Sequence, residues 1–137
     1  MPLLSWSDKF SVEVQSIDKQ HQKLFAMLNE LHDAMRAGKG RQLVPAILER
    51  LVDYTHEHFA AEEALMKQAK YPDFASHKAE HEKLKNEVAK MLKDAEHDGD
   101  WSTLSLPLLD FLRNWLQSHI VNRDKHYTAH LRTAGIH

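Results

Sequence analysis

The stretch HFAAEEALM, residues 58–66, decides how the rest of this sequence is interpreted. Its His58 and Glu62 are four residues apart, so they share one face of an α-helix. Other side chains of that face, Leu51 and Leu65 among them, are apolar and predict burial against a core. A helix that directs an imidazole and a carboxylate into a core needs partners for both from elsewhere in the chain.

The remaining sequence has the periodicity of helices. Apolar side chains recur every three or four residues and predict four helices, over residues 16–37, 42–70, 73–96 and 105–131. Ser16 and Asp73 are the expected N-caps of the first and third helices. Residues 1–15 alternate apolar and polar side chains and are expected to form an extended N-terminal arm. Long amphipathic helices with short connections predict an all-α fold, an antiparallel up-down-up-down four-helix bundle, as a single domain over residues 1–137.

Composition restricts the functions that such a bundle could have. The chain is 42% apolar and 28% charged with a net charge of −2, which is ordinary for a globular protein and does not favour nucleic-acid binding. It has no cysteine, which excludes disulfides, thiolate metal sites and covalently attached haem. No apolar run is long enough for a membrane span and no signal peptide is recognisable. We therefore expect a cytoplasmic protein. We also expect a monomer.

Several polar residues occupy positions where the helical pattern calls for leucine. They are His21, His58, Glu62, His77, His81 and His119. In an antiparallel bundle, residues early in the first and third helices and late in the second and fourth meet at the same end. Each residue alone would more often be a hydrogen-bonded core residue, but together they cannot satisfy one another without a cation. The pattern predicts a metal site.

The donor types narrow the choice of metal. Imidazoles and carboxylates without thiolates suit iron, manganese or zinc. Zinc binds four ligands, so the set is too large for one zinc ion and fits two six-coordinate ions better. Asp124, which like His119 comes late in the fourth helix, supplies a second carboxylate beside Glu62. Five imidazoles, these two carboxylates as bridges and one solvent-derived bridge would leave one coordination position open. Such a vacancy in an apolar pocket suits a small neutral ligand.

Asp124 is the member of this set that the periodicity does not support. It follows His119 by five residues, about 140° around an ideal helix, so the two side chains would not share a face. By periodicity alone Asp124 is a surface acid beside Arg123 and Lys125. If it is a ligand, we expect either a local irregularity such as a π-bulge, or a geometry in which the side chains of His119 and Asp124 approach the metals from different sides.

Four separated motifs resemble those of the hemerythrin family, in particular the single-domain bacteriohemerythrins. They are WSDKFSVEVQSIDKQH at 6–21, HFAAEEALM at 58–66, HKAEH at 77–81 and WLQSHIVNRD at 115–124. The resemblance covers nearly the whole chain and no ligand position is missing. It implies a non-haem di-iron centre with an oxo or hydroxo bridge, in which Glu62 and Asp124 join the two irons. One iron would be held by His77, His81 and His119, and the other, with the vacancy, by His21 and His58.

The resemblance also implies reversible dioxygen binding in a dry, apolar pocket. Candidates to line that pocket, which could equally be ordinary core residues, are Trp6, Leu24, Phe59, Trp115, Leu116 and Ile120. Oxygen carriage or storage is the leading interpretation, with an oxygen-consuming enzyme as a candidate partner and no catalytic activity of the chain's own. The alternatives are a di-iron enzyme (oxidase, peroxidase or nitric-oxide handling) and an oxygen or redox sensor acting through a partner protein. The E-x-x-H motif of ferritin-like di-iron enzymes is absent, which favours binding over catalysis.

Overall fold

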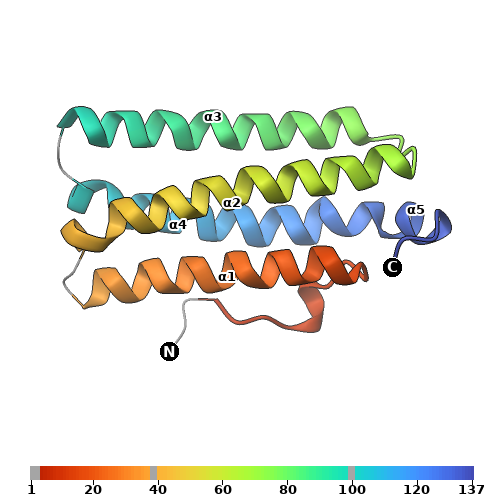
Figure 1. The fold of residues 1–137 in the computed structure, drawn as a ribbon, viewed down its shortest axis with the longest axis horizontal. Helices are drawn as coiled ribbons and strands as arrows, with labels where there is room; N and C mark the ends of the chain where they lie inside the picture. Colours follow the sequence, from red (N-terminus) through yellow and green to blue (C-terminus); the bar gives the residue numbers. More distant parts are fainter. Residues whose placement is uncertain (1–3, 38–39, 99–100) are drawn as a thin grey trace.

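The computed structural model describes residues 4–37, 40–98 and 101–137, without the side chains of residues 40–42, 44, 95–98 and 101–106. Four long helices lie side by side along the long axis of the molecule (Figure 1): α1 Gln15–Arg36, α2 Gly40–Gln68, α3 Phe74–Asp98 and α4 Trp101–Asn122. Three short elements accompany them: the 3₁₀ turns η1 Asp8–Phe10 and η2 Asp124–Tyr127, and the helix α5 Thr128–Thr133. The predicted all-α four-helix bundle is confirmed.

The arm before α1 lies against the bundle and contains one turn that was not predicted. η1 buries Phe10, whose ring packs on Trp6 and Phe25 at centroid distances of 5.8 and 5.0 Å. The arm is anchored by Asp18, whose carboxylate accepts hydrogen bonds from the Val12 N–H at 2.8 Å and the Ser11 hydroxyl at 2.6 Å. An acidic group in the first turn also suits the positive end of the helix dipole.

The first helix begins one residue earlier than predicted. Val14 occupies the N-cap position of α1 and makes no side-chain capping bond, so the prediction of Ser16 as N-cap is wrong. Asp18 explains the difference, because its carboxylate reaches back to the arm and binds the backbone there. By contrast, α3 begins at Phe74, directly after the predicted cap position Asp73.

The fourth helix differs most from the prediction. It ends at Asn122 instead of continuing to residue 131, because Arg123 leaves helical geometry with φ −122° and ψ −53°. The chain then forms η2 and α5, which bury Tyr127 and Leu131. This segment packs against the N-terminal arm, where the Thr128 hydroxyl donates to the Val12 carbonyl at 2.8 Å. Asp124 is therefore the first residue of a new turn.

The core has an apolar part and a polar end. Leucine, isoleucine, valine and phenylalanine side chains fill the bundle, and most of them are less than 5% exposed. Among the described side chains, seven buried polar ones interrupt this packing where the start of α1, the end of α2, the start of α3 and the end of α4 meet. Within the described ranges, no helix is both long enough and apolar enough to cross a membrane.

Candidate metal centre

All seven predicted ligand residues lie together in the polar end of the bundle. None of them is more than 5% exposed: His21, His58, Glu62, His77, His81, His119 and Asp124. They come from all four long helices and from η2, as the antiparallel order predicts. The break after α4 explains how Asp124 joins them. The expected irregularity is a helix end followed by a 3₁₀ turn, and not a π-bulge.

Three imidazoles form one side of the cluster. The Nε2 atom of His119 lies 3.1 Å from Nε2 of His81 and 3.1 Å from Nε2 of His77. Neighbouring nitrogen ligands about 2.1 Å from a common ion are separated by about 3 Å when they bind at right angles. The spacing of His119 from each of the other two rings is therefore that of neighbouring ligands on a six-coordinate ion.

The two carboxylates lie between these rings and the remaining two. Glu62 Oε1 is 2.9 Å from His77 Nε2, whereas Glu62 Oε2 is 2.9 Å from His58 Nε2. Asp124 is oriented in the same way, with Oδ1 2.9 Å from His119 Nε2 and Oδ2 3.1 Å from His21 Nε2. Each carboxylate thus presents one oxygen to the group of three imidazoles and the other oxygen to the group of two.

The donor atoms consequently form two sets that share both carboxylates. One set is Glu62, His77, His81, His119 and Asp124, and the other is His21, His58, Glu62 and Asp124. Within each set the ligand atoms lie within 4.8 Å of one another. Two ions bridged by two carboxylates would need this division.

The hydrogen bonding of the cluster fits bound cations. Among the described residues, the groups that face the buried oxygens of Glu62 and Asp124 are imidazole nitrogens, which satisfy a carboxylate only when they are protonated. Two buried carboxylates surrounded by neutral imidazoles are unstable unless a positive charge lies between them. Imidazole nitrogens and carboxylate oxygens are also the donors that iron, manganese and zinc accept. The residues therefore fit metal ions.

In the absence of metal, the carboxylates and imidazoles of the cluster shift one another's pKa values. Although burial opposes it, the carboxylates of Asp124 and Glu62 raise the pKa of His77 to about 9. Burial, together with the imidazoles of His119 and His77, lowers the pKa of His81 to about 2. Burial would raise the pKa of Asp124, but the imidazoles beside it hold that pKa well below its usual range. Adjacent imidazoles repel one another when both are protonated. Protons therefore supply less positive charge to the two carboxylates than two metal ions would.

Two outer hydrogen bonds orient the imidazoles, and the sequence did not predict them. His58 donates from Nδ1 to Gln20 Oε1 at 2.6 Å, and His81 donates from Nδ1 to Glu63 Oε2 at 2.8 Å. A proton held on Nδ1 leaves the Nε2 lone pair directed at the cluster. The only available signal was adjacency in sequence, since Gln20 precedes His21 and Glu63 follows Glu62.

Tyr127 is a further buried group beside the cluster that was not predicted. Its ring stacks on His77 at a centroid distance of 5.7 Å and an interplanar angle of 29°. Burial, with the nearby carboxylates of Glu62 and Asp124, raises the pKa of its hydroxyl well above the ordinary value. The ring therefore remains a neutral wall of the site.

A small apolar cavity of about 30 Å³ adjoins the cluster. Its walls include Phe59, which stacks on His81 at 3.8 Å, and Trp115, which stacks on His119 at 4.3 Å. The volume suits one water-sized or diatomic molecule. Among the side chains that the structure describes, the lining is Leu24, Leu28, Leu51, Thr55, Phe59, Leu84, Leu112, Trp115 and Leu116.

Four of the six residues that were predicted to line an apolar pocket line this cavity: Leu24, Phe59, Trp115 and Leu116. Trp6 and Ile120 do not line it. Trp6 instead packs on Phe25 at 5.4 Å in the aromatic cluster of the arm, and Ile120 is fully buried in the main core. Helical periodicity places an apolar residue inward, but it does not distinguish a cavity wall from ordinary packing.

Comparison with known proteins agrees with this geometry. A family model described as the hemerythrin HHE cation binding domain matches residues 12–131. A bacteriohemerythrin of Methylococcus capsulatus is 38% identical in an alignment that covers 93% of this chain and 95% of the relative. A bacteriohemerythrin of Stenotrophomonas maltophilia is 36% identical in an alignment that covers 96% of this chain and 84% of the relative. A crystal structure of wild-type hemerythrin has a TM-score of 0.81 at 37% identity, covering 94% of this chain and 98% of that chain. These proteins match the chain over most of its length, and its bundle contains the cluster of histidines and shared carboxylates described above. The chain therefore belongs to the hemerythrin family.

Proposed function

We propose that this chain binds dioxygen reversibly at a di-iron centre and acts as an oxygen carrier or store, not as an enzyme. One observation carries the proposal: both buried carboxylates present one oxygen to each of two imidazole groups. This arrangement suits two ions joined by Glu62 and Asp124. The names of the bacteriohemerythrin relatives support the choice of iron and oxygen.

The residues would divide between the irons unequally. His77, His81 and His119 would hold one iron and His21 and His58 the other. Because the second group has one imidazole fewer, its iron would have the open coordination position. When bound, the iron pair would supply two electrons to dioxygen and recover them when dioxygen leaves.

The chain's own part in this reaction is to exclude water from the open position. Leu24 follows His21 by one helical turn and lines the apolar cavity together with Phe59 and Trp115. Most of the described lining is apolar, and the Thr55 hydroxyl already donates its proton to the Leu51 carbonyl. Oxygen, which is neutral and apolar, loses little hydration on entering such a space, whereas an ion would lose a great deal.

The outer hydrogen bonds keep the ligands in one protonation state. Gln20 accepts the Nδ1 proton of His58, and Glu63 accepts that of His81. Both rings would therefore remain neutral ligands through Nε2 during oxygen binding and release.

A gas-exchange cycle tests the proposal. The iron-loaded protein is reduced chemically under argon, exposed to air and returned to argon, while its visible spectrum and iron content per chain are measured. We expect two irons per chain and a charge-transfer band that appears in air and disappears under argon over repeated cycles. Irreversible oxidation in the first cycle, with peroxide released, would contradict carriage and favour a di-iron enzyme or a sensor.

A further inference from the structure

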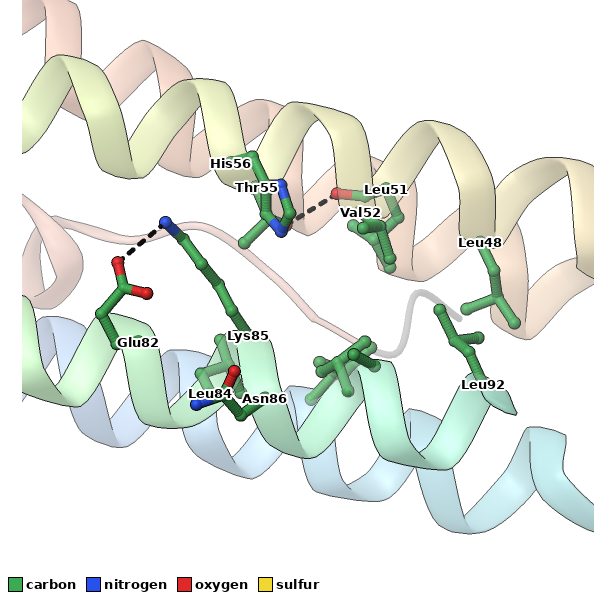
Figure 2. A pocket seen from close by; sticks show the side chains of 13 residues that line it. Leu48, Leu51, Val52, Thr55, His56, Glu82, Leu84, Lys85, Asn86 and Leu92 are labelled. Atoms are coloured by element: carbon green, nitrogen blue, oxygen red, sulfur yellow. Dashed lines mark hydrogen bonds and ion pairs between the residues drawn. The ribbon is translucent and has the colours of Figure 1, made fainter. Parts of the chain in front are cut away.

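A groove of about 330 Å³ runs between α2 and α3 and is separate from the metal cluster (Figure 2). Its size is at the lower end of the range of sites that bind small organic molecules. Apolar side chains from α2, α3 and α4 form most of its surface: Leu48, Val52, Leu84, Val88, Leu92 and Leu112. Figure 2 shows Leu48 and Leu92 facing each other at one end of the groove and Glu82 with Lys85 at the other.

Three polar side chains of the groove, those of Thr55, Glu82 and Lys85, already have hydrogen-bond partners within the protein. The Thr55 hydroxyl donates to the Leu51 carbonyl at 2.7 Å, which leaves the methyl group of Thr55 for contact with a ligand. The Lys85 ammonium donates to the Glu82 carboxylate at 3.1 Å. These two charges cancel, so the groove has no uncompensated charge from this pair to attract an anion or a cation.

We propose that this groove binds an uncharged, mainly apolar small molecule, of an alkyl or aromatic type, with at most one neutral polar group. The apolar surface would contact the body of the molecule, and His56 or Asn86 at the rim could exchange a hydrogen bond with its polar group. A carboxylate or an ammonium would have to compete with the Lys85–Glu82 pair, and burying its charge without a partner is costly. This selectivity follows from side chains that take no part in the metal cluster.

The groove also adjoins the small cavity beside the cluster. Leu51, Thr55, Leu84 and Leu112 form part of the wall of both spaces. A molecule in the groove would contact the outer side of residues whose inner side faces the cavity. The inference goes beyond the proposed oxygen binding, because recognition in the groove requires neither iron nor oxygen.

Titration with an uncharged fluorescent dye, Prodan, tests the proposal on the iron-loaded protein. We expect saturable binding at one site per chain, with emission shifted to shorter wavelength as in an apolar environment. Octanol should displace the dye, whereas octanoate and octylammonium should displace it only at concentrations higher by about tenfold or more. Non-saturable binding, or equal displacement by the charged and uncharged chains, would overturn the proposal.

Two tryptophan variants locate the site. Ala89 is exposed at the groove, so Ala89→Trp should fill it and weaken dye binding by about tenfold or more. Lys90 is its exposed neighbour in sequence and does not line the groove, so Lys90→Trp is the control and should bind the dye as the unchanged chain does. Helical content and iron per chain establish that both variants are folded. Equal dye binding by two folded variants would place the dye elsewhere and refute the site.

Discussion

At the scale of single residues, the sequence predicted the inner cluster better than its surroundings. Periodicity alone identifies a polar residue at a position where the helical pattern calls for leucine. His21, His77 and the other ligand candidates from the helices were found in this way. The contacts of Gln20 and Glu63 with ligand imidazoles were not predicted. Adjacent residues in a helix point about 100° apart, so only the packing of two helices shows which side chain Gln20 or Glu63 contacts. Asp124 needed the resemblance, since its position depends on where α4 ends.

The contact between Glu63 and His81 leads to a prediction about metal retention. Glu63→Gln removes the negative charge that accepts the Nδ1 proton of His81 at 2.8 Å. Loss of such an outer partner typically weakens metal binding by about 10- to 100-fold, so the variant should lose iron faster to a chelator. Its thermal unfolding should change little, because glutamine has nearly the same size and its amide oxygen can still accept the Nδ1 proton.

Glu57→Gln is the matched control, since Glu57 is an exposed acid on the same helix. It should lose iron at the rate of the unchanged chain. If Glu63→Gln and Glu57→Gln released iron equally fast, the Glu63–His81 contact would have no part in holding the metal.

At the scale of elements, the ends of the helices carried information that periodicity could not supply. The apolar repeat continues past Asn122 through Tyr127 and Leu131, which are both buried, so a single helix to residue 131 was the natural prediction. The structure instead turns the chain at Arg123 and still buries those two side chains. Tertiary contacts determine this break: Arg123 bonds Ser76 at 2.8 Å and pairs with Glu80, both on α3.

The role of Arg123 predicts a separation between stability and metal retention. Arg123→Ala removes two contacts that fasten the start of η2, and with it Asp124, to α3. The pair is partly exposed, so the free energy of unfolding should fall by no more than about 1 kcal/mol. Asp124 would be held less firmly, and iron should dissociate several-fold faster in a chelator assay.

Arg113→Ala provides the comparison for this prediction. Arg113 also contacts an acid, Asp110 at 3.6 Å, but both residues belong to α4 and neither holds η2. Chemical denaturation and iron release should both be close to those of the unchanged chain. An Arg123→Ala protein that released iron no faster than Arg113→Ala would show that α3 does not position Asp124.

At the scale of the whole molecule, the antiparallel order of the helices is what assembles the site. Residues from positions 21 to 124 meet at one end because alternate helices run in opposite directions (Figure 1). This could be predicted from the sequence, since long helices with short connections allow few other topologies. The lining of the cavity was predicted only in part and the groove was not predicted, because both depend on how side chains of three or four helices fill the space between them.

The charge of the cluster predicts how the whole protein responds to pH once metal is removed. The pKa of His77 is raised from 6.5 to about 9 in the fold, so its proton contributes stability that is fully present below pH 6.5 and lost as the pH rises through about 9. His81, whose pKa is lowered to about 2, is neutral in both states above pH 7 and does not oppose this trend. The melting temperature of metal-free protein should therefore fall between pH 7 and about pH 9.5.

The iron-loaded protein is the control for this titration. Its His77 Nε2 would bind metal and carry no proton, so its melting temperature should vary much less over the same range. Melting temperatures of both forms are measured by circular dichroism in matched buffers. If they fell equally with pH, His77 would not be a metal ligand that takes up a proton when the metal is removed.

The central claim is that two irons share Glu62 and Asp124 and have unequal sets of imidazoles. Anomalous diffraction at the iron absorption edge, from crystals of the iron-loaded protein, tests it most directly. The account predicts two iron positions, one contacted by His77, His81 and His119 and the other by His21 and His58, each with one oxygen from both carboxylates. A single iron position, or a carboxylate that contacts only one of two irons, would contradict it.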